Sequence, residues 1–219
     1  MLYIVSTPIG NLEDISIRAV EVLSSVDLIA AEDTRTTKIL LDHYSIAKPI
    51  ISYHSYNEER RIPELISKLK QGTSIALVSE AGTPGISDPA YKIIRTAIEQ
   101  HIPLTVIPGA SAFLSALIVS GLNVERFLFE GFIPIKKGRS TFLKKLSKEK
   151  YTIVFYESPH RLLRTLQDLK EIFGDRKISI SRELTKKFEE TYRGKISTAI
   201  DYFSKKNIRG EFVLTVEGA

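Results

Sequence analysis

Short apolar runs alternate with amphipathic stretches along the first half of the chain. Runs of four to six residues rich in Ile, Val and Leu predict strands, and the amphipathic stretches predict helices between them. The expected strands are Leu2–Ser6, Asp27–Ala31, Pro49–Ser52, Ser74–Ser79 and Leu104–Ile107, and the expected helices are Ile15–Ser25 after Asp14, Thr34–Tyr44 after Asp33, Leu65–Lys70 before Gly72, and Ala90–Gln100. Strands that alternate with helices predict a mainly parallel sheet covered on both faces.

The pattern changes after Gly121, where several expected strands follow one another without a helix between them. The expected strands are Phe127–Glu130, Tyr151–Tyr156, Lys177–Arg182, Phe188–Tyr192 and Phe212–Val216, and the expected helices are Thr141–Ser147, Pro159–Phe173 and Ser197–Ser204. This order favours a mixed sheet over a second parallel one. The sequence therefore predicts two α/β domains, residues 1–120 with a mainly parallel sheet and residues 121–219 with a mixed sheet.

Composition is that of a soluble globular protein. Hydrophobic residues make up 43% of the 219 residues and charged residues 26%, which are ordinary values. There is no cysteine, which excludes disulfides and thiolate metal sites. The first residues lack the basic segment of a secretory signal, and the uncharged segment Gly109–Asn123 is too short and too rich in small and polar residues to span a bilayer. We therefore expect a cytoplasmic protein.

The charge balance is compatible with a polyanionic partner. The net charge is +5, and the densest basic block, Ile135–Lys150, carries seven Lys or Arg against one Glu. Such a block is typical of a contact with phosphates, and equally of a solvated loop that leads into a helix. Both interpretations stay open at this point.

The segment Ser79–Pro89, SEAGTPGISDP, joins an expected strand to an expected helix. It lacks the Lys and the Ser or Thr that follow the last glycine of a P-loop, and it lacks the three-glycine dinucleotide pattern. Its prolines fix the backbone and remove N–H donors, so we expect a stiff backbone wall rather than an anion cradle. Asp88 and Pro89 are expected to start the next helix. A tight turn with no further role is the alternative.

Ligands bind beyond the carboxyl ends of the strands in open α/β sheets, so the loops that follow the strands form the expected site. In the first domain these loops are Thr7–Asn11, Glu32–Arg35, Tyr53–Ser55, Ser79–Pro89 and Pro108–Ala112. In the second domain the segments Glu157–His160 and Arg182–Lys186 are expected at one end of the sheet.

Seven segments in order give the chain a family resemblance. They are LYIVSTPIGNLEDIS, AAEDTRTT, LVSEAGTPGISDP, PGASA, FYESPHRL, RELTKKFEE and GEFVLTVEG, and they run from Leu2 to Gly218. Together they resemble the ribosomal RNA small subunit methyltransferase I group of the tetrapyrrole (corrin and porphyrin) methyltransferase superfamily. Seven ordered matches over nearly the whole chain are far more specific than one glycine pattern.

The resemblance implies a two-domain α/β enzyme, usually a homodimer, that binds S-adenosylmethionine (SAM) in the cleft between its domains. Similar members methylate the ribose 2′-hydroxyl of a cytidine in 16S ribosomal RNA, so the implied partner is the 30S ribosomal subunit. No metal is implied, because the sulfonium supplies its own positive charge and leaving group. The implied cofactor contacts are Ile9, Gly82, Thr83, Ile86, Ser111, Ala112, Tyr156 and Phe212. Ordinary packing is the alternative for Ile9, Ile86 and Ala112.

A ribose hydroxyl is a weak nucleophile, and a positioned base assists its attack. Asp33, Glu183 and His54 are the candidates, because each follows an expected strand. Asp33 has an alternative role as a helix cap, Glu183 as the partner of a neighbouring cation, and His54 as an ordinary loop residue.

RNA contacts are expected next to these carboxylates. Arg35, Arg182 and Lys186 are candidates for phosphate binding, and Tyr53 or Tyr56 for stacking on an unpaired base. Ion pairs within the protein and packing of the rings are the alternatives.

Other functions remain open. A tetrapyrrole-pathway C-methyltransferase would share the fold and cofactor, but it is expected to carry Gly-Asp-Pro where this chain has Gly82-Thr83-Pro84. A non-catalytic RNA-binding module would leave the glycine- and proline-rich loops without a role, and a nucleotide-dependent enzyme is disfavoured by the missing P-loop residues. Members of the group commonly continue into a basic helical extension after the VEG segment, so weaker RNA binding is expected of a chain that ends at Ala219.

Overall fold

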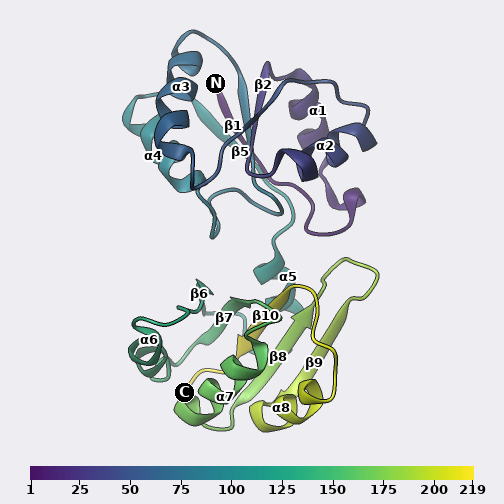
Figure 1. Ribbon diagram of the computed structural model, residues 1–219, viewed down its shortest axis with the longest axis vertical. Coiled ribbons are helices and arrows are strands. Elements are labelled where there is room, and N and C mark those ends of the chain that lie inside the picture. The colour runs from purple at the N-terminus through teal and green to yellow at the C-terminus, as the bar shows by residue number, and fades with distance from the viewer. The chain divides into compact units, whose positions relative to one another are not determined.

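Every strand of the first sheet runs parallel to its neighbours (Figure 1). The computed structural model describes residues 1–219 and divides them into two units, residues 1–111 and 112–219. The first sheet has the order β3-β2-β4-β1-β5, with β1 Leu2–Val5, β2 Leu28–Ala31, β3 Ile50–Ser52, β4 Ile75–Val78 and β5 Leu104–Ile107. The predicted parallel sheet is confirmed, and all five predicted strands are present.

Helices cover both faces of this sheet because its inner strands are apolar on both sides. Leu28 and Ala30 of β2 belong to a core cluster with α3 and α4, whereas Ile29 and Ala31 belong to a second cluster with α1 and α2. The helices are α1 Ile17–Ser25, α2 Thr34–His43, α3 Glu58–Lys70 and α4 Ala90–Glu99. Figure 1 shows the two pairs on opposite sides of the strands.

Two helix starts of the first unit differ from the prediction. Ser16, not Asp14, caps α1, because the Ser16 side chain accepts a hydrogen bond from Ala19 N–H, while Asp14 ends a short 3₁₀ helix, Leu12–Asp14. Helix α3 starts at Glu58 rather than Leu65 and contains Pro63. The apolar face of α3 continues across this proline through Ile62, so packing outweighs the missing N–H donor.

The second sheet is mixed, as predicted. Its order is β6-β7-β10-β8-β9, in which β6 and β7 are parallel and the other neighbours are antiparallel. The strands are β6 Phe127–Phe132, β7 Thr152–Glu157, β8 Lys177–Arg182, β9 Glu190–Lys195 and β10 Phe212–Val216. Helices α6 Arg139–Leu146, α7 Leu162–Phe173 and α8 Ile196–Ser204 cover one face through a single core cluster.

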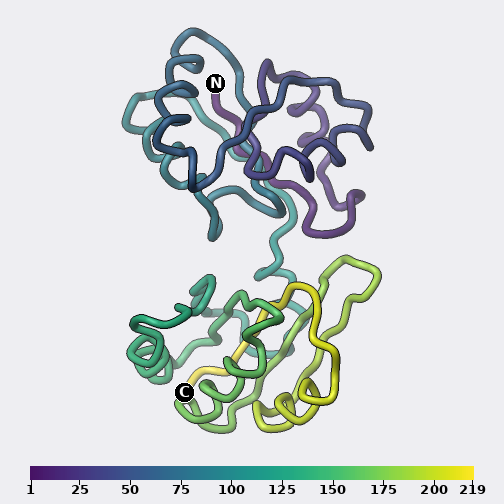
Figure 2. The backbone as a smooth tube through the Cα atoms, viewed as in Figure 1, coloured from purple at the N-terminus to yellow at the C-terminus, as the bar shows by residue number.

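Helix α5, Ala112–Val119, packs against β7, β8 and β10 of the second sheet. Its sequence AFLSALIV is apolar except for Ser115, so no periodicity marks it as a helix. Figure 2 traces the chain from β5 directly into it. The division between the units therefore falls at 111/112, before α5, whereas the sequence placed the boundary at 120/121. No helix in the structure is both long and apolar enough to cross a membrane.

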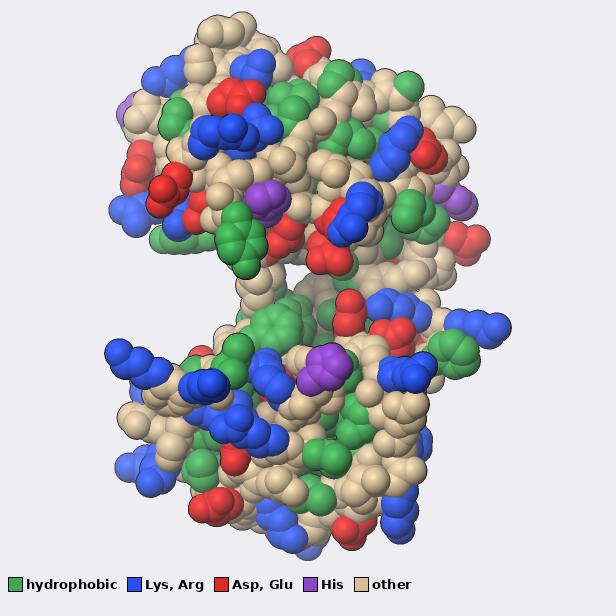
Figure 3. Space-filling view, in the orientation of Figure 1, with side chains coloured by type: hydrophobic (Ala, Val, Ile, Leu, Met, Phe, Trp, Pro, Cys, Tyr) green, Lys and Arg blue, Asp and Glu red, His purple; other side chains and the backbone are tan.

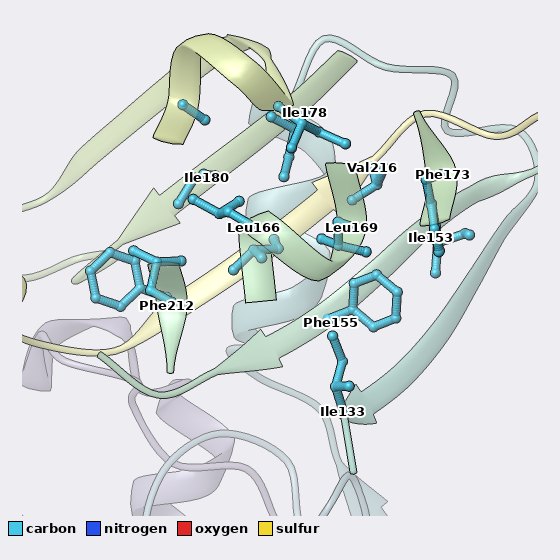
Figure 4. Close-up of a cluster of buried hydrophobic side chains, with 14 of the residues drawn as sticks. Ile133, Ile153, Phe155, Leu166, Leu169, Phe173, Ile178, Ile180, Phe212 and Val216 are labelled. Atoms are coloured by element: carbon cyan, nitrogen blue, oxygen red, sulfur yellow. The ribbon is translucent and has the colours of Figure 1, made fainter. Parts of the chain in front are cut away.

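The core of the second unit gives a stability prediction. Leu166 of α7 has no exposed surface and lies among Phe155, Ile180 and Phe212 in the core cluster (Figure 4). We expect Leu166→Ala to lower the free energy of unfolding by about 2–5 kcal/mol, since it removes buried methyl groups and leaves a cavity. Urea unfolding followed by circular dichroism measures this change. Ile39→Ala, on the exposed side of α2, is the control, with a change of about 0.5 kcal/mol or less; equal losses would contradict the assigned core.

Candidate functional site

The loops that follow the five strands of the first sheet lie along one edge of it, because all five strands are parallel. We call this the carboxyl edge. It brings together the segments 6–11, 32–33, 53–57, 79–89 and 108–111. The predicted gathering of these loops is confirmed, although their residues come from positions more than 100 apart in the chain.

Backbone hydrogen bonds join the loops after β1 and β4. Thr7 N–H donates to Gly82 O at 2.9 Å, and Gly82 N–H donates to Thr7 O at 3.1 Å. Gly82 has a φ of +79°, a left-handed conformation that favours glycine. A Cβ at this position would lie 3.3 Å from Ile9 Cγ2 and 3.5 Å from Ala110 O. The glycine therefore lets three loops approach one another closely.

The hydroxyl of Thr83 connects the same three loops. Thr83 Oγ1 donates to Ala110 O at 3.2 Å and lies 2.9 Å from Ser6 Oγ. Ser6 N–H in turn donates to Ile107 O at 3.1 Å. Thr83 is thus a cross-link between the loops that follow β1, β4 and β5.

Several N–H groups of the segment Ser79–Pro89 are engaged within the protein. Gly85 N–H donates to both carboxylate oxygens of Asp88, at 2.8 and 2.9 Å, and Ala90 N–H donates to Asp88 Oδ1 at 2.8 Å. Ile86 N–H donates to Thr83 O at 3.3 Å. These contacts agree with a stiff wall rather than an anion cradle. Asp88 supplies the capping carboxylate of α4, and Pro89 takes the N-cap position, one residue later than predicted.

Asp33 caps α2. Its Oδ1 accepts hydrogen bonds from the N–H groups of Arg35 and Thr36, at 2.7 and 3.3 Å, and its Oδ2 accepts one from Arg35 Nη2 at 2.9 Å. The side-chain hydrogen bond from Arg35, followed by that from the Arg35 N–H, lowers the pKa of Asp33 to about 2. Both oxygens of this weakly basic carboxylate are occupied, so the capping role that the sequence left open is confirmed.

Glu32, the residue before Asp33, has the opposite environment and was not among the sequence-predicted candidates. It is half-buried, and its Oε2 accepts one hydrogen bond, from Glu80 N–H at 3.1 Å. Burial raises its pKa, and the negative charges of Asp88 and Glu80 raise it further, against the opposing effects of the Glu80 N–H and His54. Its place at the end of an inner strand is the signal that could have identified it.

Tyr53 and His54 follow β3 with different exposures. Tyr53 is buried in a core cluster and donates its hydroxyl to Pro89 O at 3.0 Å, and burial raises its pKa to about 12. Its ring has no face open to an RNA base, whereas the ring of Tyr56 is 97% exposed. His54 Nε2 lies 3.2 Å from Asn57 Nδ2, and its buried Nδ1 has no partner.

Glu183, after β8, is held in a turn. Its φ is +51°, and its Oε1 accepts hydrogen bonds from Lys186 Nζ and Glu211 N–H, each at 3.0 Å. Partial burial raises the pKa of Glu183, but these two hydrogen bonds outweigh it, and the pKa is lowered overall. Lys186 also donates to Glu211 Oε2 at 2.9 Å. The pairing of Glu183 with a neighbouring cation, the sequence-based alternative to catalysis, is therefore present.

The remaining predicted residues of the second unit lie at one end of its sheet. Phe212, at the start of β10, pairs with Glu157 at the end of β7 and with Arg182 at the end of β8. The Phe212 ring is buried in the core (Figure 4), so only its backbone faces this end of the sheet. Tyr156 is half-buried, with its ring against those of Phe129 and Phe132. Arg182 donates its Nε to Arg209 O at 2.6 Å.

A buried ionic network, which the sequence did not reveal, lies behind this end of the sheet. Glu157 accepts hydrogen bonds from Ser158 N–H at 2.7 Å and Thr165 Oγ1 at 2.6 Å, and it pairs with Arg161 Nη2 at 2.6 Å. Arg139 donates to Thr165 Oγ1 at 2.8 Å. Arg139 also pairs with Asp168 at 2.7 Å. The network connects β7 to α6 and α7.

The basic block surrounds α6. Figure 3 shows Lys and Arg side chains gathered over this helix and the loop before it. Arg139 is buried in the ionic network, but none of the six lysines of the block forms an ion pair: Lys136, Lys137, Lys144, Lys145, Lys148 and Lys150. A hollow between the ends of α6 and α7 is lined by Lys144, Lys145 and Lys148. These lysines are thus available to phosphates, in contrast to Lys186.

Comparison with known proteins matches almost the whole chain. The family model described as Tetrapyrrole (Corrin/Porphyrin) Methylases matches residues 1–200. A protein of Thermotoga maritima named Ribosomal RNA small subunit methyltransferase I is 50% identical over 99% of this chain and 98% of its own length. A protein of the same name from Synechocystis sp. is 52% identical over 100% of this chain and 79% of its own length.

A solved structure, that of a cobalt precorrin-4 methyltransferase from cobalamin biosynthesis, shares the fold with a TM-score of 0.74. The match covers 99% of this chain and 94% of that protein. Sequence identity is 14%, so this likeness concerns the fold alone.

The cross-link at Thr83 gives a prediction. Thr83→Val keeps the shape of the side chain but leaves Ala110 O without its donor, so we expect the free energy of unfolding to fall by about 0.5–1.5 kcal/mol. Thr83→Ser keeps the hydroxyl and is the matched control. Chemical denaturation of the ligand-free protein measures both variants. A Thr83→Val protein no less stable than Thr83→Ser would show that the hydroxyl does not hold the loops.

Proposed function

Given that the chain is a methyltransferase of the tetrapyrrole (corrin/porphyrin) methylase family, within its ribosomal RNA small subunit methyltransferase I group, we propose that it methylates the ribose 2′-hydroxyl of a cytidine in 16S ribosomal RNA. The methyl donor that we propose is SAM. One observation carries the proposal: along the whole chain, about half of the residues are identical to proteins named Ribosomal RNA small subunit methyltransferase I. The tetrapyrrole-enzyme structure that shares the fold is only 14% identical, so it gives no support to a tetrapyrrole substrate.

The carboxyl edge fits the proposed cofactor. Gly82 and Ile9 are buried where the linked loops meet, whereas Thr83 and Ile86 beside them keep exposed surface that a partly apolar ligand can cover. We propose that Ile9, Gly82, Thr83 and Ile86 contact the cofactor from the linked loops, and that Ser111 and Ala112 contact it from the segment after β5. When bound, the sulfonium supplies an activated methyl group and a neutral thioether leaving group. The residues of the chain need only bind it, orient it and exclude water.

Tyr156 and Phe212 are proposed as cofactor contacts of the second unit. Tyr156 offers a half-buried aromatic surface. Phe212 has a buried ring, so its contact is limited to backbone atoms. A cofactor contact made by backbone atoms does not depend on the side chain. We therefore expect substitution of Phe212 to change these contacts with the cofactor less than substitution of Tyr156.

The RNA partner is proposed to contact the unpaired lysines around α6. Single-stranded and duplex RNA both present a dense row of phosphates, and free lysines bind them without first breaking an internal ion pair. Arg35 is exposed but pairs with Asp33, and Lys186 already binds two carboxylates. We therefore propose the lysines around α6 as the main phosphate contacts, with Arg35, Arg182 and Lys186 in a smaller role and Tyr56 in place of Tyr53 for base stacking.

Cofactor binding and methyl transfer test the function directly. We expect calorimetric titration to show binding of SAM and S-adenosylhomocysteine, and tritium from labelled SAM to enter 16S RNA of 30S subunits that lack the modification. Mapping the labelled position to a ribose 2′-oxygen of a cytidine completes the assignment. Label in a base, or no label in RNA, would overturn the proposed substrate, and absent cofactor binding would overturn the proposed donor.

A pair of glycine variants localises the cofactor. Gly82→Ala and Gly72→Ala both place a Cβ at a positive φ, +79° and +93°. A Cβ at Gly72 would meet nothing within 4 Å, and Gly72 follows α3 rather than a strand. We expect Gly82→Ala to weaken SAM binding about tenfold or more, and Gly72→Ala to leave it unchanged. Equal effects would assign the loss to backbone strain alone.

A matched pair of lysine variants tests the RNA surface. Lys144 and Lys145 lie in the last turn of α6, as Lys68 and Lys70 lie in the last turn of α3. We expect Lys144→Gln/Lys145→Gln to flatten the dependence of log Kd for RNA on log salt by about 0.7–0.9 per lost phosphate contact. Lys68→Gln/Lys70→Gln should keep the wild-type slope. Filter binding over a range of salt concentrations measures both, and equal slopes would place the RNA elsewhere.

A further inference from the structure

Glu32 lies at the end of an inner strand of the carboxyl edge. Its N–H donates to Val78 O at 3.1 Å, which fixes the backbone between β2 and β4. The side chain is half-buried, and Oε2 accepts a hydrogen bond from Glu80 N–H at 3.1 Å. Oε1 accepts no hydrogen bond from the protein, and no Lys or Arg pairs with this carboxylate. One oxygen is therefore held in place while the other is available.

The charges around Glu32 favour a proton on it. Glu80, after β4, and Asp88, before α4, are negative neighbours, while His54, after β3, is the one neighbour that opposes them by its charge. On its own segment, Asp33 is neutralised by Arg35. A carboxylate with this partial burial and these neighbours binds a proton more readily than an ordinary glutamate. That property is what a general base requires.

Asp33 and Glu183 are engaged elsewhere, and the unpartnered nitrogen of His54 is buried. Both oxygens of Asp33 accept hydrogen bonds at the start of α2. Glu183 is paired with Lys186 and receives the N–H of Glu211. His54 has Nε2 at Asn57 and a buried Nδ1. Among the titratable residues of the carboxyl edge, Glu32 thus combines a fixed position, a free acceptor atom and a favourable charge environment.

We propose that Glu32 is the general base that takes the proton from the nucleophilic hydroxyl, an inference that rests on the proposed methyl transfer to RNA. The hydroxyl proton passes to Glu32 Oε1 as the hydroxyl oxygen forms a bond to the methyl carbon. The bond between that carbon and sulfur breaks, and its electron pair stays on sulfur. The products are a methyl ether, a neutral thioether and a protonated Glu32, which returns its proton to water.

Glu32→Gln is the first test. Glutamine has the same shape and keeps an oxygen for Glu80 N–H, so the loop should remain in place. We expect kcat to fall by about 10²–10⁴-fold, with the Kd for S-adenosylhomocysteine and for RNA changed less than about twofold. Retained ligand binding shows that the variant is folded. Glu32→Asp, which keeps a carboxylate at a shorter reach, should recover part of the lost rate.

The pH profile separates a base from a structural residue. The deprotonated carboxylate is the active form, so kcat should rise with pH through a pKa above the usual value of about 4.5. Glu80→Gln removes a negative neighbour, which lowers this pKa, so the rise should move to lower pH. In Glu32→Gln the rise should be absent. A carboxyl signal observed by ¹³C NMR should titrate with the same raised pKa in the ligand-free protein and vanish in Glu32→Gln.

The outcomes of these tests are distinguishable. If the wild-type protein labels no ribose in 30S subunits, the proposed function fails, whatever Glu32 does. If the wild type transfers methyl groups and Glu32→Gln does so at the same rate and with the same pH profile, the proposed base is overturned. A Glu32 signal that titrates like an exposed glutamate would also overturn it, independently of cofactor and RNA.

Discussion

Parallel strands must all end at the same edge of their sheet, and the backbone groups of the loops that leave this edge still need hydrogen-bond partners. In the first unit the reciprocal bonds of Thr7 and Gly82 supply such partners, and the Thr83 hydroxyl extends them to Ala110. The positions of Ile9 and Ile86 depend on this arrangement, and Glu32 is joined to the loop after β4 by the Glu80 N–H. These bonds link the loops into one surface without a disulfide, since the chain has no cysteine.

Adjacent residues at the end of β2 show how the same chemical group acquires different properties. Asp33 lies at the start of a helix, where N–H groups and Arg35 favour its charged form. Glu32 directly follows the last residue of the strand, where partial burial and two other carboxylates favour its neutral form. The two carboxylates thus differ in proton affinity through environment alone, which is how enzymes separate acid–base roles.

The strands and the location of the site could be predicted from the sequence because they follow from local apolar runs and one topological rule. Helix α5 could not be predicted, because an apolar segment without periodicity is equally compatible with a buried strand and a buried helix. The roles of individual side chains were harder still to predict from the sequence. Tyr53 follows β3 and has a loop-like sequence context, but its burial depends on the packing of α3 and α4 against β3. Glu183 and Lys186 meet Glu211 only because β8 and β10 are neighbours.

The ionic network around Glu157 has a consequence for how such a chain can change over generations. The network is a series of hydrogen bonds and an ion pair that runs from Glu157 through Thr165 and Arg139 to Asp168. Losing Asp168 leaves the buried Arg139 guanidinium without its ionic partner, and a broken buried ion pair costs about 3–5 kcal/mol. Because these side chains share hydrogen bonds and ion pairs, the effects of substitutions at their positions on stability are expected to be coupled rather than additive. The network therefore makes this part of the interior harder to change by single steps than side chains that form no such contacts.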